Sequence, residues 1–382
     1  MPHPYSSISR RNLLAGGLAL ATLAAVQPAL ADGSFPEPGP FPPRDALLTY
    51  ADMIKALEKI ERTSKGAVQV TTLRELGISP GVSEAGRDLY VATVGTGDTH
   101  VWLQGRIHGN EPYGTDTMLD VLKSVGSNGN PTFRRIRDEL TLHVIPMYNP
   151  DGSELYIRHT VLQDGSGRRI DLNRDWAPNA FQAKESIAWY TYWNQVKPDY
   201  GLDIHHQGLK YADDGEPITM SLGISLAPSG PTLPGVKGGL YDVQTRQMQG
   251  QVYSALQGYG FVNIDRYSVG GGGNFYEIDI RGGVASAVMI GLNWQDMNPT
   301  GHSHPMVFFE TYGGSIGQKS RGKAIEQNVR GTVALLEGLA TGSTWGTDPL
   351  IWHDQIPHVP FVGYQTDGGL VTPWPAQGPV TP

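Results

Sequence analysis

The residues best suited to chemistry lie in the segment 105–114, where a histidine and a glutamate stand three positions apart. His108 and Glu111 follow a predicted strand and occupy a glycine-bounded turn before a predicted helix. In open α/β sheets, ligands bind just past the carboxyl ends of the strands. Zinc accepts imidazole nitrogen and carboxylate oxygen, and catalytic sites use three protein ligands plus a water. The pair is therefore a candidate zinc site, although an exposed turn with a helix-start glutamate also fits it.

A third ligand has to come from another strand end, and the segment 200–208 supplies one. Strand alternation places His205 and His206 on opposite faces, so one of them faces the metal and the other packs or supports. The chain contains no cysteine, so a metal site must use histidine and carboxylate ligands alone.

A candidate general base ends the apolar run 306–309. Glu310 follows four apolar residues of a predicted central strand. Buried acids are rare unless they are paired or take part in function. Zinc lowers the pKa of its bound water from 15.7 to about 7, so a nearby carboxylate suffices as the base. The alternative for this segment is a solvated glutamate at a strand end.

Five short motifs in chain order together resemble the carboxypeptidase A-like metallocarboxypeptidases. The resemblance runs from about Leu47 to Leu339, most of the chain. The motifs that carry it are His108-Gly-Asn-Glu111, Asn149-Pro-Asp-Gly152, Asp171-Leu-Asn-Arg174-Asp-Trp176, Asp203-Ile-His205 and Phe309-Glu310-Thr311.

The resemblance implies a role for each matching residue. His108, Glu111 and His205 would bind one zinc ion, which leaves His206 as the extra histidine. Glu310 would take a proton from the zinc-bound water and pass it to the leaving amine. The implied activity is release of the C-terminal residue from peptides that have a free terminal carboxylate.

Further residues would bind that substrate. Asn173 and Arg174 match the pair that holds the terminal carboxylate, and a guanidinium grips a carboxylate bidentately. Arg158 stands roughly where the family keeps an arginine that polarises the scissile carbonyl, although Arg168 or Arg169 also fits this role.

Two stretches depart from the family pattern. Tyr276 is the candidate for the family's mobile tyrosine, but its distance from the following glycines does not match. A longer insertion covers 291–305 and includes His302 and His304, a pair that is more often solvated than metal-bound. Because the residue that sets side-chain preference should lie in this stretch, the preferred C-terminal side chain stays open.

Strand-like and helix-like segments alternate along most of the chain. The pattern predicts an α/β fold, a single domain with a mixed, mostly parallel central sheet flanked by helices. Strands are expected at 89–94, 101–107, 140–147, 200–204, 284–290 and 306–309, and helices at 47–63, 115–125, 181–196, 240–256 and 319–339.

The first 31 residues have the features of a twin-arginine signal peptide. Arg10 and Arg11 precede the apolar run 15–26, which is too short to span a bilayer, and small residues precede Asp32. We therefore expect export to the periplasm or the medium. Without this segment the chain has 27 basic and 37 acidic residues, a net charge of −10. That balance argues against nucleic acid and anionic membranes as partners.

The remaining chain divides into three parts. Residues 32–45 are predicted to be a Pro/Gly-rich linker, 46–341 the zinc carboxypeptidase-like catalytic domain, and 342–382 a Pro/Gly-rich C-terminal tail. Two other enzyme functions fit: a zinc amidohydrolase of the succinylglutamate desuccinylase and aspartoacylase type, and a carboxypeptidase that trims cell-wall peptides. A peptide-binding pseudoenzyme is disfavoured because all three candidate ligands and the acid are present. The oligomeric state stays open.

Overall fold

The computed structural model describes residues 47–176, 181–224, 239–278, 302–314, 318–366 and 369–371. The predicted signal peptide and linker, the strand expected at 284–290 and residues 291–301 of the insertion lie outside the described residues.

An eight-stranded sheet forms the centre of the molecule, in the order β1-β2-β4-β3-β7-β14-β10-β11. The pairs β4–β3, β3–β7, β7–β14 and β10–β11 are parallel, and the other three neighbouring pairs are antiparallel. The predicted mixed α/β sheet is therefore confirmed. The strands span Val68–Thr72 (β1), Tyr90–Val94 (β2), Thr99–Gly105 (β3), Leu140–Ile145 (β4), Tyr200–Gln207 (β7), Met220–Ile224 (β10), Ile264–Arg266 (β11) and Met306–Tyr312 (β14).

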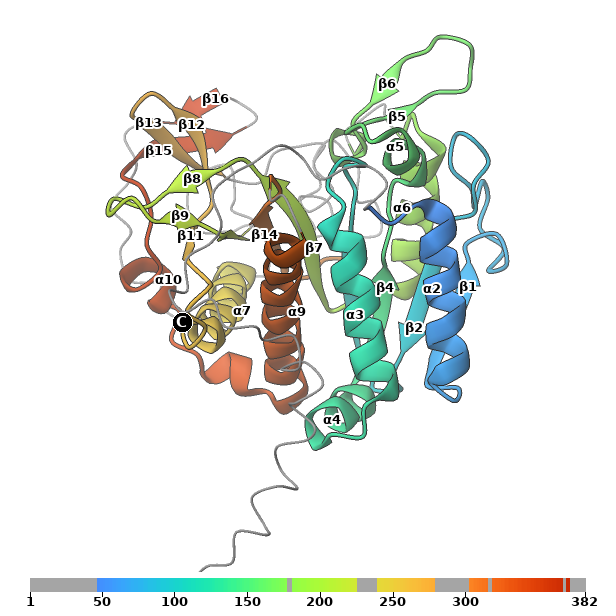
Figure 1. Ribbon diagram of the computed structural model, residues 1–382, viewed down its shortest axis with the longest axis horizontal. Helices are drawn as coiled ribbons and strands as arrows, with labels where there is room; N and C mark the ends of the chain where they lie inside the picture. Colours follow the sequence, from blue (N-terminus) through green and yellow to red (C-terminus); the bar gives the residue numbers. More distant parts are fainter. Residues whose placement is uncertain are drawn as a thin grey trace, which may run out of the picture.

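Helices cover both faces of this sheet. In Figure 1, α2, α3, α7 and α9 lie in front of the strands and α6 lies behind them. The helices span Tyr50–Thr63 (α2), Tyr113–Ser127 (α3), Pro131–Glu139 (α4), Lys184–Val196 (α6), Leu240–Leu256 (α7) and Gln318–Thr341 (α9). The α4 helix was not predicted, because only Phe133 and Ile136 of its nine residues are buried.

The two faces of the sheet differ in what they bury. The face under α2, α3, α7 and α9 packs a large, mainly aliphatic core that includes Leu57, Leu122, Val252 and Leu335. The opposite face, under α6, packs an aromatic core that includes Trp102, Trp176, Trp189 and Trp193. Because side chains alternate along a strand, β2, β3, β4 and β14 contribute to both cores.

The segment after residue 342, set apart above as a tail, packs on the preceding part of the chain as far as it is described. Trp352 is buried, and β15 pairs in parallel with β13. The elements there and in the smaller sheets span Ser343–Gly346 (η5), Ile351–Asp354 (α10), Phe361–Thr366 (β15), Gly369–Val371 (β16), Ser268–Gly271 (β12) and Asn274–Ile278 (β13).

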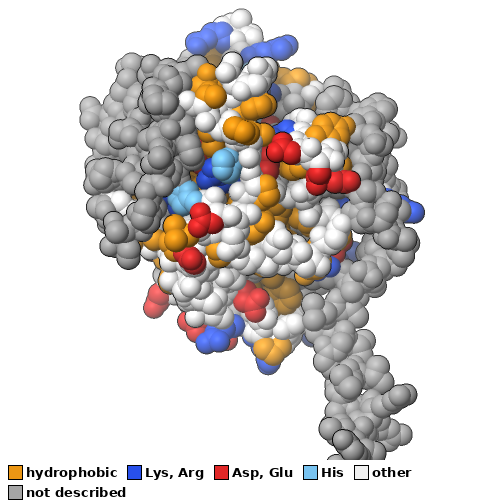
Figure 2. All heavy atoms as spheres, turned by 90° about the vertical axis from the view of Figure 1, so that its left-hand side faces the viewer, with side chains coloured by type: hydrophobic (Ala, Val, Ile, Leu, Met, Phe, Trp, Pro, Cys, Tyr) orange, Lys and Arg blue, Asp and Glu red, His pale blue; other side chains and the backbone are white. Residues whose placement is uncertain are grey.

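Short elements complete the described structure: Pro150–Leu155 (α5), Leu172–Arg174 (η2), and the strand pairs Thr160–Val161 with Arg169–Ile170 (β5, β6) and Lys210–Tyr211 with Pro217–Ile218 (β8, β9). Figure 2 shows the face on the left of Figure 1, where the hydrophobic side chains that reach the surface lie in separate groups among polar and charged ones. Within the described ranges, no helix combines the length and the apolar character needed to cross a membrane.

Candidate active site

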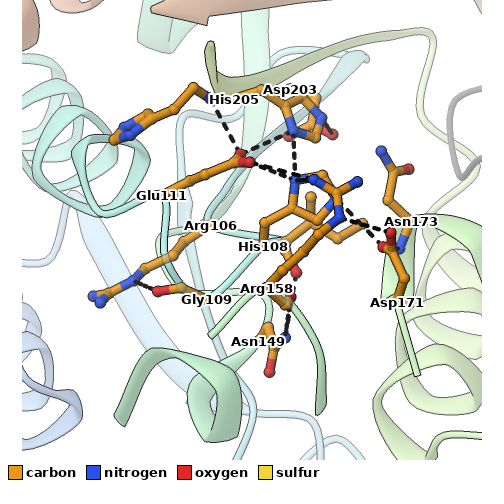
Figure 3. Close-up of polar contacts among 12 residues, drawn as sticks. Arg106, His108, Gly109, Glu111, Asn149, Arg158, Asp171, Asn173, Asp203 and His205 are labelled. Atoms are coloured by element: carbon orange, nitrogen blue, oxygen red, sulfur yellow. Dashed lines mark hydrogen bonds and ion pairs between the residues drawn. The ribbon is translucent and has the colours of Figure 1, made fainter. Parts of the chain in front are cut away.

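Three buried side chains converge at the carboxyl ends of two neighbouring strands. His108 Nδ1 lies 2.8 Å from Glu111 Oε1, and His205 Nδ1 lies 3.2 Å from Glu111 Oε2. The two imidazole Nδ1 atoms are only 3.2 Å apart. Figure 3 shows His108 and Glu111 from the turn after β3 pointing at His205 from β7.

This donor set fits a zinc ion. One ligand atom from each of the three residues lies within 4.8 Å of the others, and all three side chains are buried. Burial works to raise the pKa of Glu111, but His108 and His205 hold that pKa well below its usual value. Two nitrogens and a carboxylate oxygen that face one point match the two-histidine, one-glutamate set of catalytic zinc sites.

Each histidine also contacts a carboxylate with its other ring nitrogen. His205 Nε2 lies 2.8 Å from Asp203 Oδ2, and His108 Nε2 lies 3.3 Å from Asp171 Oδ1. Asp203 in turn accepts a hydrogen bond of 2.8 Å from the amide of Gln104 on β3. Such outer partners fix ring orientation and raise the basicity of a ligating histidine.

The turn that carries the ligands packs tightly on the Asn149-Pro-Asp-Gly152 segment. A Cβ atom at Gly109 would lie 2.0 Å from the carbonyl carbon of Gly152, so only glycine fits there. The Asn149 side chain accepts a hydrogen bond from the Gly152 N–H and so caps α5. The motifs 108–111 and 149–152 found in the sequence thus pack directly against each other.

Arg158 reaches the same site from the segment after α5. Its Nε donates to Asp171 Oδ2 at 2.8 Å, and its Nη1 lies 3.3 Å from His108 Nδ1 and 3.7 Å from Glu111 Oε1. The alternative residues are exposed: Arg168 directly precedes β6, and Arg169 is its first residue and pairs with Val161 of β5.

Asn173 and Arg174 follow Asp171 in the single turn η2. The Asp171 carboxylate accepts from the Asn173 N–H at 2.9 Å, which orients the turn. Asn173 is buried, whereas Arg174 is exposed, and its Nη1 donates to the carbonyl of Asn173 at 2.7 Å. Both residues therefore lie beside the Asp171 carboxylate that contacts His108.

Glu310 lies on β14 directly beside His205, its partner in the parallel register of β7 and β14. It is 9% exposed. Burial raises its pKa to about 8; Glu111 and Asp203 add to the rise, and His205 opposes it. A dication held by the three ligands would favour the ionised carboxylate.

Comparisons with known proteins agree with this geometry. Residues 61–208 match the family model of zinc carboxypeptidases, and this stretch includes all three candidate ligands. A metallo-carboxypeptidase from Burkholderia cenocepacia superposes with a TM-score of 0.52 over 78% of this chain and 70% of that one, at 19% identity. Carboxypeptidase A from Helicoverpa armigera gives 0.55 over 87% and 81%, at 15% identity.

The chain has the zinc carboxypeptidase fold. In sequence, the probable carboxypeptidase 2 of Arthroderma benhamiae is 31% identical over 105 residues, which are 28% of this chain and 18% of that relative. The chain spans less than a third of the length of the curated relatives it matches.

Within this zinc carboxypeptidase fold, His206 points away from the ligand group. Its Nε2 accepts a hydrogen bond from the Tyr113 N–H at 3.1 Å, and its ring packs on the Tyr113 ring. Burial lowers the pKa of His206 to about 4. Its own backbone N–H donates to Glu111 Oε2 at 3.1 Å, so the main chain at this position supports the ligand.

Arg106, which sequence reasoning missed, stabilises the turn that carries His108 and Glu111 through hydrogen bonds to backbone carbonyls. It is 1% exposed and has a φ of 60°, and its guanidinium donates to the carbonyls of Gly109, Leu48 and Ser153 at 3.0, 3.0 and 3.4 Å. One side chain thus ties the turn to α5 and to the segment before α2. A buried arginine without a carboxylate in these contacts gave no pattern that could have revealed it.

The two tyrosines on either side of the glycine run 270–273 lie in different sheet environments. Tyr276, the predicted mobile residue, lies in β13 and is paired with Val269 and Gly363 in the four-stranded sheet. Tyr267 instead directly follows β11, where the charge of Glu310 and burial raise the pKa of its phenol. The structure thus brings Tyr267 to the site, a residue that no motif had indicated.

His302 and His304 do not join the ligand group. His304 accepts a hydrogen bond from Trp193 Nε1 at 2.9 Å, and His302 Nε2 lies 2.8 Å from the carbonyl oxygen of Pro198. Both lie before β14, at the end of the sheet opposite the candidate zinc site. Within the described part of the chain, the ligand triad is the one group of three or more acidic or histidine side chains arranged for a metal.

Proposed function

We propose that this protein is a zinc-dependent exopeptidase that hydrolyses the C-terminal peptide bond of peptides. One observation carries the proposal. A buried two-histidine, one-glutamate group stands beside a buried glutamate on the adjacent strand, in a fold shared with carboxypeptidases. Three ligands with an acid in reach are what metal-assisted hydrolysis requires.

His108, Glu111 and His205 would hold the zinc. When bound there, zinc would supply Lewis-acid polarisation and make water easier to deprotonate near neutral pH. Asp203 and Asp171 would keep both imidazoles in the tautomer that presents Nδ1.

Glu310 would accept a proton from the attacking water and later donate it to the nitrogen of the departing residue. Burial raises the pKa of this carboxyl and a bound dication would lower it, so the acid would be ionised to accept the proton and could still return it to the leaving nitrogen. The neighbouring His205 main chain fixes the distance between the base and the ligand group.

Arg158 would donate to the oxygen of the scissile carbonyl as negative charge develops on it. Its guanidinium is already oriented by Asp171 and lies within 4 Å of two candidate ligands. Asn173 and Arg174 would bind the terminal carboxylate, a role that suits the exposed guanidinium of Arg174. This grip would confine cleavage to the last peptide bond.

We further propose that the protein acts outside the cytoplasm after twin-arginine export. Arg10, Arg11 and the apolar run 15–26 support this location. Expression of the full chain with the double substitution Arg10→Lys/Arg11→Lys should leave the protein unexported, and cell fractionation would measure this. Export at the normal level would contradict the assignment.

A peptide-library digest tests the activity. The chain from Asp32 onward, loaded with zinc, should shorten peptides by one residue at the C-terminus, as read by mass spectrometry. Chelation should stop the reaction, and peptides with an amidated C-terminus should resist. Hydrolysis of N-acyl amino acids with intact peptides would instead support the amidohydrolase alternative, and internal cleavage would contradict exopeptidase action.

A further inference from the structure

Four strands present one side chain each in a line that starts at the candidate zinc site. His205 on β7 is the register partner of Glu310 on β14, Glu310 is the partner of Ser221 on β10, and Ser221 is the partner of Asp265 on β11. Neighbouring strands lie about 4.8 Å apart, so Ser221 and Asp265 stand about 5 and 10 Å beyond the base.

All four side chains project from the same face of the sheet. The residue next to each of them along its strand belongs to the aliphatic core on the opposite face: Ile204, Phe309, Leu222 and Ile264. Since side chains alternate, Ser221 and Asp265 must lie on the side of Glu310. Ser221 and Asp265 therefore lie on the same face of the sheet as the candidate zinc site, on the side of Glu310 that is farther from the zinc ligands.

Lys210 contacts the two residues of this line that lie farthest from the candidate zinc site, Ser221 and Asp265. Lys210, from β8, has its Nζ 2.7 Å from Asp265 Oδ2 and 3.1 Å from Ser221 Oγ, while Ser221 Oγ contacts Asp265 Oδ1 and lies 2.9 Å from Gln207 Oε1. The Lys210 side chain is 23% exposed and the Asp265 side chain 6%. A buried ion pair is weak evidence for stability, because desolvation offsets the attraction.

The cluster of Lys210, Ser221 and Asp265 retains one hydrogen-bond donor for a ligand. Both Asp265 oxygens have a donor beside them, from Lys210 and Ser221. An ammonium has three hydrogens, and two acceptors contact Lys210 among the described residues. The third N–H of the partly exposed Lys210 ammonium can therefore donate to an acceptor on a ligand.

An aromatic surface lies beside this polar group. Phe308, two residues before Glu310 and on its face, has its ring over Gly223, where a Cβ atom would lie 2.0 Å from the ring. The Tyr267 ring stands edge-on to it, with centroids 5.4 Å apart. Phe308 and Tyr267 are both partly exposed, so they offer an apolar surface to a ligand.

We propose that Lys210, held by Asp265 and Ser221, binds the side chain of the substrate's C-terminal residue and selects side chains that end in a carboxylate or amide. Glutamate and glutamine fit best, because their methylenes can cover Phe308 and Tyr267 while the acceptor reaches the ammonium. This inference rests on the proposed exopeptidase function, since it assigns the specificity of the same site.

Four peptides that differ only in the last residue test the inference. The zinc-loaded chain from Asp32 onward is assayed on Ala-Ala-X peptides with X as Glu, Gln, Leu or Lys. We expect kcat/KM for Glu and Gln to exceed that for Leu and Lys about tenfold or more, because only Glu and Gln offer an acceptor to the charged Lys210 ammonium. Lys210→Met should remove this preference, and Lys210→Arg should largely keep it.

Two controls separate recognition from misfolding. Lys55→Met removes a lysine whose side chain is 76% exposed, and it should leave the Glu-to-Leu ratio unchanged. The double variant Lys210→Met/Asp265→Asn leaves no unpaired buried charge, and it should lose the preference as Lys210→Met does. A folded double variant that still prefers Glu overturns the inference.

The outcomes distinguish the two proposals. If no peptide loses its last residue, the exopeptidase function fails and this inference fails with it. If residues are released but Leu or Lys is preferred by the unmodified chain, the function stands and the inference alone is wrong. A Glu preference that Lys210→Met does not change also overturns it, because another group must then recognise the side chain.

Discussion

The two faces of the central sheet are built from the same strands, but their chemistry differs around the candidate site. On β14, Phe309 is fully buried in the aliphatic core under α7 and α9, while Glu310, the next residue, lies beside His205 on the other face. On β7, Ile204 and His205 divide in the same way. The alternation of a strand thus places a functional group one residue from a packed one.

This difference explains why the site can hold buried charge. The aliphatic core on one face and the aromatic core on the other supply apolar burial, which offsets the unfavourable burial of a row of carboxylates and imidazoles at the site. Substitutions at the candidate site should therefore alter metal binding and turnover. Substitutions in the aliphatic core should alter the free energy of unfolding.

The largest expected effect is on metal content. His205→Ala should lose most of the bound zinc, because two protein ligands remain where catalytic sites use three. His206→Ala removes an acceptor of the Tyr113 N–H and should cost about 1–3 kcal/mol of stability while zinc stays bound. Elemental analysis of the dialysed variants measures this contrast, and equal zinc loss would show that the wrong histidine was chosen.

On the aliphatic face, Phe309→Ala should lower the free energy of unfolding by about 3–5 kcal/mol, the usual cost of emptying a core phenylalanine site. The neighbouring Phe308→Ala should cost clearly less, because this side chain is only partly buried on the site face. Urea titration of both variants supplies the comparison. If both variants lost a similar free energy of unfolding, the aliphatic core would not contribute more to stability than the site face.

A smaller effect is expected from the partner of His205. Asp203→Asn keeps the shape but removes the charge that orients and polarises the imidazole, so zinc affinity should fall about 10–100-fold. Asp213→Asn, on an exposed loop, serves as the matched control. Competition with a chromogenic chelator measures both, and unchanged affinity in Asp203→Asn would remove Asp203 from the site.

A pH effect is expected on the aromatic side. Glu185, in the first turn of α6, is fully buried, and burial raises its pKa to about 8. The folded state then keeps a proton that the unfolded state loses above its ordinary pKa of 4.5. Stability should therefore fall as pH rises from about 4.5 to 8, by at most about 1.4 kcal/mol per pH unit.

Glu185→Gln should flatten that decline, since glutamine does not ionise. Unfolding by urea at pH 5 and pH 8 compares the variant with the unmodified chain. If both lose the same stability between the two values, Glu185 does not hold its proton in the folded state.

Much of the sheet and one half of the site followed from pattern. Long apolar runs and helical periodicity located the central strands and the helix Leu240–Leu256, whose predicted and observed ends coincide. His108, Glu111, His205 and Glu310 were identifiable because each follows a strand or lies near its carboxyl end, where open α/β sheets gather their sites.

The rest depended on register, which no local pattern encodes. Lys210, Ser221 and Asp265 belong to three short strands and form no motif in the sequence. Tyr267 and Tyr276 flank the same glycine run, and only the pairing of β11 and β13 decides which of them lies beside Glu310.

The central proposal is that Glu310 acts as the base beside a zinc site formed by His108, Glu111 and His205. The most direct test is kcat/KM for C-terminal release by zinc-loaded Glu310→Gln, measured with its zinc content. Glutamine keeps the shape but cannot accept the proton, so the rate should fall about 10²–10⁴-fold or more with one zinc still bound per chain. A near-normal rate in the zinc-loaded variant would contradict the account.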